Sequence, residues 1–295
     1  MSTQSKSGTL RLMKINRTRR VQTGALLTVF IAVASGVLST GVGAIGDDKT
    51  PSMASFSDIL ALVARRPSIE EAYGPDPLQT TLFFEAVGSL KRRVVLIHGG
   101  CWSNQYTRAH IAPLATALAD AGFNVWVPEY RRAGDTGGGW PGTYRDVTAA
   151  INQIARQSNE LPIAVGHSAG GHLALLAAAD PDVALAGVVG LAAITDLSVY
   201  SQQEGTCPAM ARELMGATYA DAPEQYRAAS VMASGITIPA HLLRGSLDSI
   251  VGEDQLAGFA PHQIVQIPDA GHFDLIHPKH RAFDVLVDLL ASTNP

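Results

Sequence analysis

One serine stands between two glycines in the stretch AVGHSAGGHLALLAAAD, residues 164–180. Gly166, Ser168 and Gly170 form a G-x-S-x-G pattern, which begins at the end of a short apolar, strand-like run and leads into a helix-forming run. This context places a serine on a tight, strained turn with its hydroxyl exposed, where side chains at the glycine positions would collide with neighbouring backbone. The pattern therefore predicts that Ser168 is a nucleophile.

A serine hydroxyl is a weak nucleophile at neutral pH, so it needs a base and a carboxylate that orients the base. His272, in PDAGHFD, follows the last expected strand, and Asp248, in LLRGSLDSIV, follows the preceding one. Serine, acid and histidine in this chain order form one of the known triad arrangements. We therefore predict a triad of Ser168, Asp248 and His272. The less favoured alternatives are His172, His241, His277 and His280 for the base and Asp196, Glu253 and Asp254 for the acid.

Acyl transfer also requires hydrogen-bond donors for the developing oxyanion. HGGCW, residues 98–102, ends a strand that precedes the serine strand, and its glycines allow backbone N–H groups to face a substrate. We expect Gly100 and Cys101 to supply one donor and Ala169 the other. His98 and His167 flank the site and are expected to pack beneath the loops.

Aromatic residues that follow strand ends on the same side are candidates for a substrate pocket. Trp102 and Trp140 are the ones we assign to substrate binding. The alternative for both is that they only pack the loops.

Apolar runs alternate with amphipathic segments from residue 56 onward. A short helix is expected at 56–66. Strands are expected at 94–100, 124–130, 162–167, 185–194, 239–245 and 262–268, and further helices at 110–123, 143–157 and 280–292. This alternation predicts an α/β fold with a mostly parallel central sheet and helices on both faces. Residues 196–235 are too long and too mixed in polarity for a simple crossover, and we expect a small lid insertion there.

The first 44 residues read as an export signal. Six basic residues and no acidic ones precede an uncharged stretch from Gly24 to Ala44, with a small-residue cleavage site at its end. An uncleaved membrane anchor is the alternative, as is a true start at Met13. Residues 45–57 are expected to be a linker and 58–295 the folded domain. The protein is therefore expected in the periplasm or secreted, or held at a membrane by its N-terminal segment.

Charge and cysteine content exclude several classes of partner. Residues 1–44 hold six of the 22 basic residues and none of the 26 acidic ones, so the mature chain has a net charge of −10, which argues against nucleic acid. Cys101 and Cys207 are the two cysteines, and both are expected near the mouth of the site, so a disulfide can form in an oxidising compartment. No zinc-binding motif occurs, and we expect neither a metal nor another cofactor.

The HGG loop, the segment GHSAGGHLA and the segments GSLDSIV and AGHFD together resemble the α/β-hydrolase superfamily. Within it they are similar to the esterases, lipases and arylformamidase-like enzymes that carry an H-G-G-x-W loop and a G-H-S-A-G elbow. The likeness runs from about Asp58 to the C-terminus. Cys101 departs from it, because it stands where lipase-like esterases have a third glycine and arylformamidases a tyrosine.

This resemblance implies a cofactor-independent carboxylic ester hydrolase of EC 3.1.1 type that acts on a small or medium ester. It also implies catalysis by Ser168, Asp248 and His272, with an oxyanion hole at Gly100, Cys101 and Ala169. One alternative is an arylformamidase-like or peptide-like amide hydrolase. The other is a non-catalytic binding protein on the same fold.

Overall fold

The computed structural model describes residues 53–88, 92–231 and 235–293. The chain divides into two units, Met1–Asp48 and Lys49–Pro295, and all of the described residues belong to the second. The expected export signal or anchor, with its cleavage site, lies outside the described residues. In the described ranges, no helix has the length and apolar character needed to cross a membrane. The fold below is that of the second unit.

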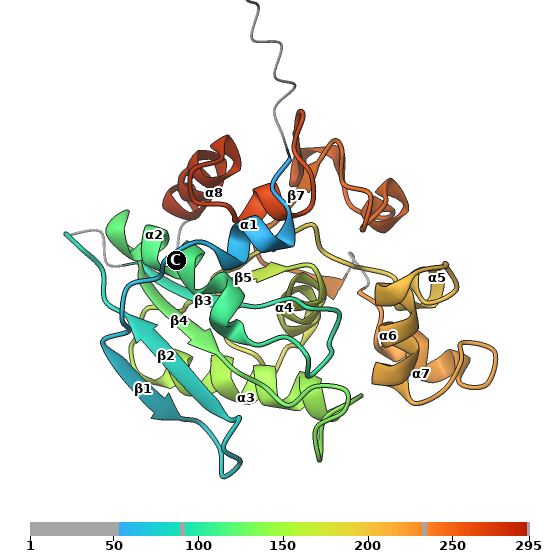
Figure 1. The fold of residues 1–295 in the computed structure, drawn as a ribbon. Coiled ribbons are helices and arrows are strands. Elements are labelled where there is room, and N and C mark those ends of the chain that lie inside the picture. Colours follow the sequence, from blue (N-terminus) through green and yellow to red (C-terminus); the bar gives the residue numbers. More distant parts are fainter. Residues whose placement is uncertain (1–52, 89–91, 232–234, 294–295) are drawn as a thin grey trace, which may run out of the picture. The chain divides into compact units, whose positions relative to one another are not determined.

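An eight-stranded, mostly parallel sheet forms the centre of this unit (Figure 1). Its strands are β1 (Ile69–Ala72), β2 (Thr80–Phe84), β3 (Arg93–Ile97), β4 (Asn124–Pro128), β5 (Ile163–His167), β6 (Gly187–Leu191), β7 (Ala240–Gly245) and β8 (Ile264–Ile267). They lie in the order β1-β2-β4-β3-β5-β6-β7-β8. The pairs from β4 to β8 are parallel, whereas β2 is antiparallel to both β1 and β4. The predicted parallel sheet is confirmed, and β1 and β2 add an antiparallel edge that the apolar runs did not indicate.

Helices cover both faces of the sheet. They are α1 (Phe56–Leu60), α2 (Ala112–Asp120), α3 (Gly142–Arg156), α4 (Ala169–Ala179) and α8 (Arg281–Ser292), with short 3-10 turns η1 (Arg108–Ile111), η3 (Glu253–Leu256), η4 (Pro261–Gln263) and η5 (Phe273–Ile276). Side chains alternate along β3, so that Val94 and Leu96 pack with residues of α1, α2 and α8, and Val95 and Ile97 with residues of α3 and α4. Every residue of β3 is buried, as expected for a strand covered on both faces.

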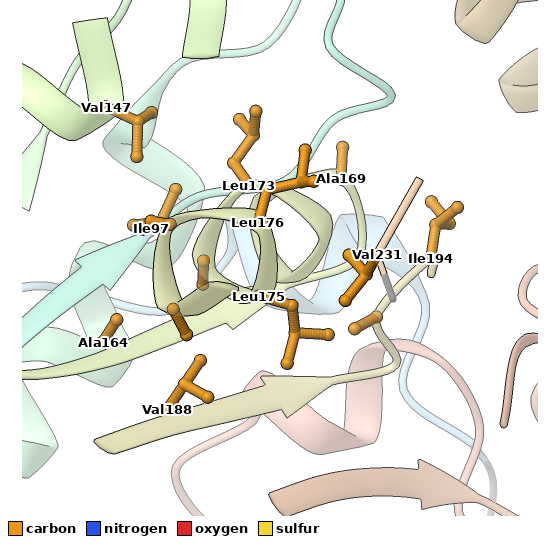
Figure 2. Close-up of a cluster of buried hydrophobic side chains, with 14 of the residues drawn as sticks. Ile97, Val147, Ala164, Ala169, Leu173, Leu175, Leu176, Val188, Ile194 and Val231 are labelled. Atoms are coloured by element: carbon orange, nitrogen blue, oxygen red, sulfur yellow. The ribbon is translucent and has the colours of Figure 1, made fainter. Parts of the chain in front are cut away.

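Helix α4 is buried among apolar neighbours on all sides (Figure 2). Leu173, Leu175 and Leu176 belong to the same core cluster as Ile97 of β3 and Val188 of β6. A helix that is apolar around its whole circumference is stable only inside a core. The helix that follows Ser168 is therefore held rigidly in place by packing.

In the described residues, three helices form an insertion between β6 and β7 (Figure 1). They are α5 (Leu197–Tyr200), α6 (Thr206–Met215) and α7 (Pro223–Ala228). Asp196 begins the insertion as the N-cap of α5, where its side chain accepts from the backbone N–H groups of Ser198 and Val199. The role of this carboxylate is thus structural.

The N-terminal part of the described chain departs from expectation in two ways. Residues 53–57, expected to end a linker, belong to the packed unit, because the N–H of Ala54 donates to Asp274 and Phe56 opens α1. The helix expected at 56–66 ends at Leu60. Beyond it the N–H of Arg65 donates to Thr116 Oγ1 at 2.9 Å, which gives the segment a tertiary partner in place of helical hydrogen bonds.

Candidate active site

Ser168 occupies the sharp turn that the sequence predicted between β5 and α4. Its φ of 54° and ψ of −119° lie in a region that non-glycine residues rarely adopt. The backbone N–H of Ser168 donates to the carbonyl of Leu191 at 2.8 Å, which holds the turn against β6. A Cβ on Gly170 would lie 2.3 Å from the carbonyl oxygens of Ile97 and His98, so only glycine permits this approach.

His272 and Asp248 form a buried hydrogen-bonded pair. His272 Nδ1 lies 2.8 Å from Asp248 Oδ2, and Asp248 Oδ1 accepts from the N–H groups of Ile250 and Val251. Burial alone would raise the pKa of Asp248, but the hydrogen bond from His272 and those from the backbone outweigh it, so the pKa lies below its ordinary value. Because the carboxylate is ionised, it fixes the proton on Nδ1 and leaves Nε2 free to accept one.

Ser168 and His272 line the same cavity, whose volume is about 490 Å³. One part of its wall comes from the serine and histidine loops and from Gly100 and Cys101. The other lining residues come from the N-terminal segment, the insertion and neighbouring loops: Phe56, Tyr106, His110, His167, Tyr200, Gln203, Glu204, Gly205, Thr206, Cys207, Pro208, Ser249, Ile250 and Phe273. A pocket of this size accommodates a small molecule.

The backbone N–H groups of Gly100, Cys101 and Ala169 are the candidate donors to a bound substrate. Gly100 and Cys101 line the cavity after β3, both with positive φ, and Ala169 is the first residue of α4. Within the described ranges none of these N–H groups donates a hydrogen bond to the protein. The first N–H groups of a helix have no intrahelical acceptor, which is why that of Ala169 is available. The arrangement suits the stabilisation of a negatively charged oxygen.

A disulfide joins Cys101 to Cys207, with a Cα–Cα distance of 5.1 Å. It connects the loop after β3 to α6 of the insertion, and both cysteines line the cavity. The bridge that the sequence allowed is therefore present, and it attaches the insertion covalently to the site.

Neither tryptophan assigned to substrate binding lines the cavity beside Ser168. Trp102 is fully buried, and its Nε1–H donates to His172 Nδ1 at 3.2 Å. Trp140 packs on Tyr144, at a ring distance of 5.6 Å, beside a separate surface hollow. This corrects the assignment of both residues, because the chain turns Trp102 into the core and Trp140 lies beside α3. Trp102 and Trp140 instead pack against neighbouring side chains, which was the alternative considered for both.

The other histidines near strand ends have structural partners. His98 is buried between the carbonyl of Gly99 and the carboxylate of Glu129. His167 lines the cavity and lies 3.1 Å from the carbonyl of His272 through Nε2, and burial holds its pKa well below the ordinary value. Its position beneath the loops is as expected, and a low pKa keeps it neutral beside His272.

The rival bases and acids also have other contacts. His172 bonds to the carbonyl of Ala229, and His280 is the N-cap of α8. Glu253 pairs with Arg244, and Asp254 accepts from Gln203. Among His172, His241, His277 and His280, none is a lining residue of the cavity. His272 does line the cavity, unlike these four alternatives for the base.

The sequence did not point to Phe56, Tyr106 or Phe273 as cavity residues. Phe273 directly follows His272, and this adjacency was the available signal. Phe56 and Tyr106 reach the site from distant parts of the chain, and no spacing rule relates them to the triad candidates. In the described part of the chain, no three histidine, cysteine or acidic side chains lie close enough together to bind a metal ion.

A buried ionic network lies behind the loop after β3. Glu129 binds His98 at 2.8 Å and Arg132 at 3.0 Å, and it accepts from the N–H of Arg108. Burial acts to raise the pKa of Glu129, yet the hydrogen bond and charge interactions with His98, together with Arg132, lower it from 4.5 to about 2. In the folded protein the Glu129 carboxylate therefore stays ionised between about pH 2 and pH 4.5. In the unfolded chain the same group is protonated over this range.

We expect Glu129→Gln to change the stability of the protein in acid. A carboxyl group whose pKa is lower in the folded state stabilises the fold above its unfolded pKa, and this contribution is lost as the pH falls from 4.5 to about 2. The wild type should therefore lose roughly 3 kcal/mol more of its unfolding free energy than the variant across this window. Urea unfolding followed by circular dichroism at several pH values measures the difference. Exposed Glu224→Gln is the control, and parallel profiles for wild type and Glu129→Gln would refute the prediction.

Comparisons with known proteins agree on the type of fold. The family described as BD-FAE matches residues 85–260, more than half of the chain, and this match includes Ser168 and Asp248 but ends before His272. No curated protein matches the chain. A truncated carbohydrate esterase from gut microbiota is 17% identical with a TM-score of 0.63, covering 79% of this chain and 98% of its own. Esterase B from Lactobacillus rhamnosis is 20% identical with a TM-score of 0.61, and the match covers 80% of this chain and 90% of the esterase. Thermogutta terrifontis esterase 2 is 18% identical with a TM-score of 0.60, and the match covers 76% of this chain and 93% of the esterase. At these identities the likeness concerns the fold.

Proposed function

Because the chain belongs to the BD-FAE family and has the α/β-hydrolase fold, we propose that it is a serine hydrolase of small or medium carboxylic esters. The observation that carries this proposal is the pairing of His272 with Asp248 on a cavity that also contains Ser168. The esterases among the solved structures with this fold support the choice of ester hydrolysis.

The geometry suggests a role for each group in the reaction. Ser168 Oγ attacks the ester carbonyl carbon while His272 Nε2 accepts the hydroxyl proton, and Asp248 keeps the other ring nitrogen protonated. His272 then donates the proton to the departing alcohol, which leaves an acyl-enzyme on Ser168. Water, deprotonated by His272, releases the acid and restores the serine.

The backbone donors of Gly100, Cys101 and Ala169 would stabilise the oxyanion in both steps. A donor of this kind commonly contributes about 3 kcal/mol to transition-state stabilisation. Because these donors are backbone N–H groups of a loop and a helix start, they are directed by the fold and need little reorganisation during the reaction.

A cavity of about 490 Å³ supports a substrate of small or medium size. Its aromatic lining from Phe56, Tyr106 and Phe273 suits an apolar portion of the ester. Gln203 and Thr206 of the insertion offer polar groups to another portion.

We also propose that the protein acts outside the cytoplasm. The basic, then uncharged, N-terminal 44 residues and the Cys101–Cys207 disulfide support export, because disulfides persist in oxidising compartments. Retention at a membrane by an uncleaved N-terminal segment is the alternative. N-terminal sequencing of the exported protein distinguishes the two: a start at Ile45 supports cleavage, and an intact leader supports anchoring.

The first test is hydrolysis of p-nitrophenyl esters from acetate to octanoate by protein that starts at Ile45. Acyl-enzyme chemistry predicts turnover of the shorter esters with a p-nitrophenol burst of about one equivalent where deacylation is slower than acylation. N-formylkynurenine is supplied in parallel as an amide substrate. Deformylation without ester turnover would replace this proposal by the amide hydrolase alternative, and silence on every substrate would contradict hydrolysis of simple esters.

A further inference from the structure

The segment that begins the described chain forms part of the cavity wall. Phe56 is half-buried and lines the cavity although it lies 112 positions before Ser168 in the chain. Its ring lies 5.5 Å from that of Tyr106 and 5.4 Å from that of Phe273. Tyr106 packs against Gly100, and Phe273 directly follows His272. Phe56 therefore bridges the loop after β3 that carries Gly100 and Cys101, called the oxyanion loop below, and the loop that carries His272, called the histidine loop.

A buried carboxylate fastens this segment to the histidine loop. Asp274 is 5% exposed, and its Oδ1 accepts from the N–H of Ala54 at 2.9 Å. Its Oδ2 accepts from the N–H of Gly271, the residue before His272, at 2.7 Å. One side chain therefore holds both the start of the segment and the backbone that carries the candidate base.

Local structure fixes the direction of the segment on each side of Phe56. Ser55 and Asp58 form a capping box at the start of α1, in which each side chain accepts from the other's backbone N–H. Ile59 is 1% exposed and packs in the same core cluster as Leu275 and Ile276 of η5. The backbone that carries the Phe56 ring thus lies between two anchored positions.

We propose that Phe56 determines the acyl-length specificity of this site and that Asp274 positions His272 by fastening the segment to its loop. The inference rests on the proposed ester hydrolase activity and extends it to residues that lie outside the region 85–260 matched by the family. The Cys101–Cys207 disulfide also lines the cavity, and it ties the insertion to the oxyanion loop. The size of the Phe56 ring then limits the length of the acyl chain that the cavity accepts.

Two substitutions of Phe56 change the cavity in opposite directions. Phe56→Ala shortens the side chain, and we expect the ratio of kcat/KM on p-nitrophenyl octanoate to that on the acetate to rise about tenfold, because one methylene more or less in an apolar pocket changes specificity by about 10- to 200-fold. Phe56→Trp enlarges the side chain, which narrows the cavity, and should lower the same kcat/KM ratio by a similar factor. Leu60→Ala, on the exposed side of the same helix, is the matched control and should leave the ratio unchanged.

The position of His272 is tested by Asp274→Asn, which preserves shape but presents an amide N–H to one of the two backbone donors. We expect kcat to fall about tenfold on every ester while KM on each ester stays within about a factor of two, because a small displacement of a catalytic group mainly affects the chemical step. Active-site titration by the burst amplitude corrects for any misfolded fraction. A fall in stability alone would leave kcat per titrated site unchanged and would overturn the positioning role.

The outcomes separate this inference from the proposed function. If the wild type turns over esters but both Phe56 variants keep its chain-length ratio, the specificity role of Phe56 is overturned and the hydrolase activity stands. Opposite shifts for alanine and tryptophan support it, and the tryptophan variant supplies the test if the alanine variant does not fold. A wild type that hydrolyses no ester overturns the proposed function and this inference with it.

Discussion

Ser168→Ala is expected to lower kcat on p-nitrophenyl esters by about 10⁴- to 10⁶-fold and to abolish the burst. Alanine has no hydroxyl to attack the carbonyl, so no acyl-enzyme can form. It also fits the space, since Ser168 is 3% exposed and its backbone is held by the hydrogen bond to Leu191. The variant should therefore fold and bind substrate, and its loss of activity should lie in kcat.

His272→Ala should cost a similar factor, and the double variant Ser168→Ala, His272→Ala little more, because the two groups act as one unit. Ser249→Ala is the matched control: Ser249 also lines the cavity, and we expect its loss to change kcat less than about threefold. Steady-state kinetics and burst amplitudes measure all four proteins. A Ser168→Ala protein that keeps its burst would place the nucleophile elsewhere, and additive losses in the double variant would show that Ser168 and His272 act independently.

Removal of the Cys101–Cys207 disulfide is expected to lower the free energy of unfolding more than any other substitution proposed for this protein. Cys101 and Cys207 are 106 positions apart, and closing a loop of about 100 residues restricts the unfolded chain by up to about 4.7 kcal/mol. The variant Cys101→Ala, Cys207→Ala should therefore unfold at markedly lower urea concentration. Its kcat should also fall, because the bridge holds the loop that carries the N–H groups of Gly100 and residue 101.

Urea unfolding of the wild type with and without dithiothreitol, beside the double variant, measures this effect. Reduction should lower the midpoint of the wild type and leave that of the variant unchanged, which is the internal control. Equal midpoints for the oxidised wild type and the double variant would show that the bridge adds no stability, and unchanged kcat would show that it does not hold the oxyanion loop.

The sequence alone determined the core of the fold and the residues of the elbow. Solid apolar runs at 94–100 and 162–167 predicted buried parallel strands, because a strand covered on both faces has no polar side. The glycines around Ser168 indicated the turn, because a side chain at Gly166 would collide with the backbone of Gly170 and one at Gly170 with the backbone after β3. Asp248 and His272 could be selected because the ends of consecutive parallel strands meet at one edge of a sheet, and the structure places them 2.8 Å apart.

Only the tertiary structure decided which side chains surround these groups. Trp102 and Trp140 follow strand ends as required of pocket residues, yet the loops turn them away from the cavity. Phe56 carries no local sign of its place, and its contact with Phe273 depends on a buried carboxylate and on core packing across more than 200 residues. Local patterns report hydrogen bonding and burial within one element, whereas the wall of a cavity is set by how distant elements pack together, which no short stretch of sequence encodes.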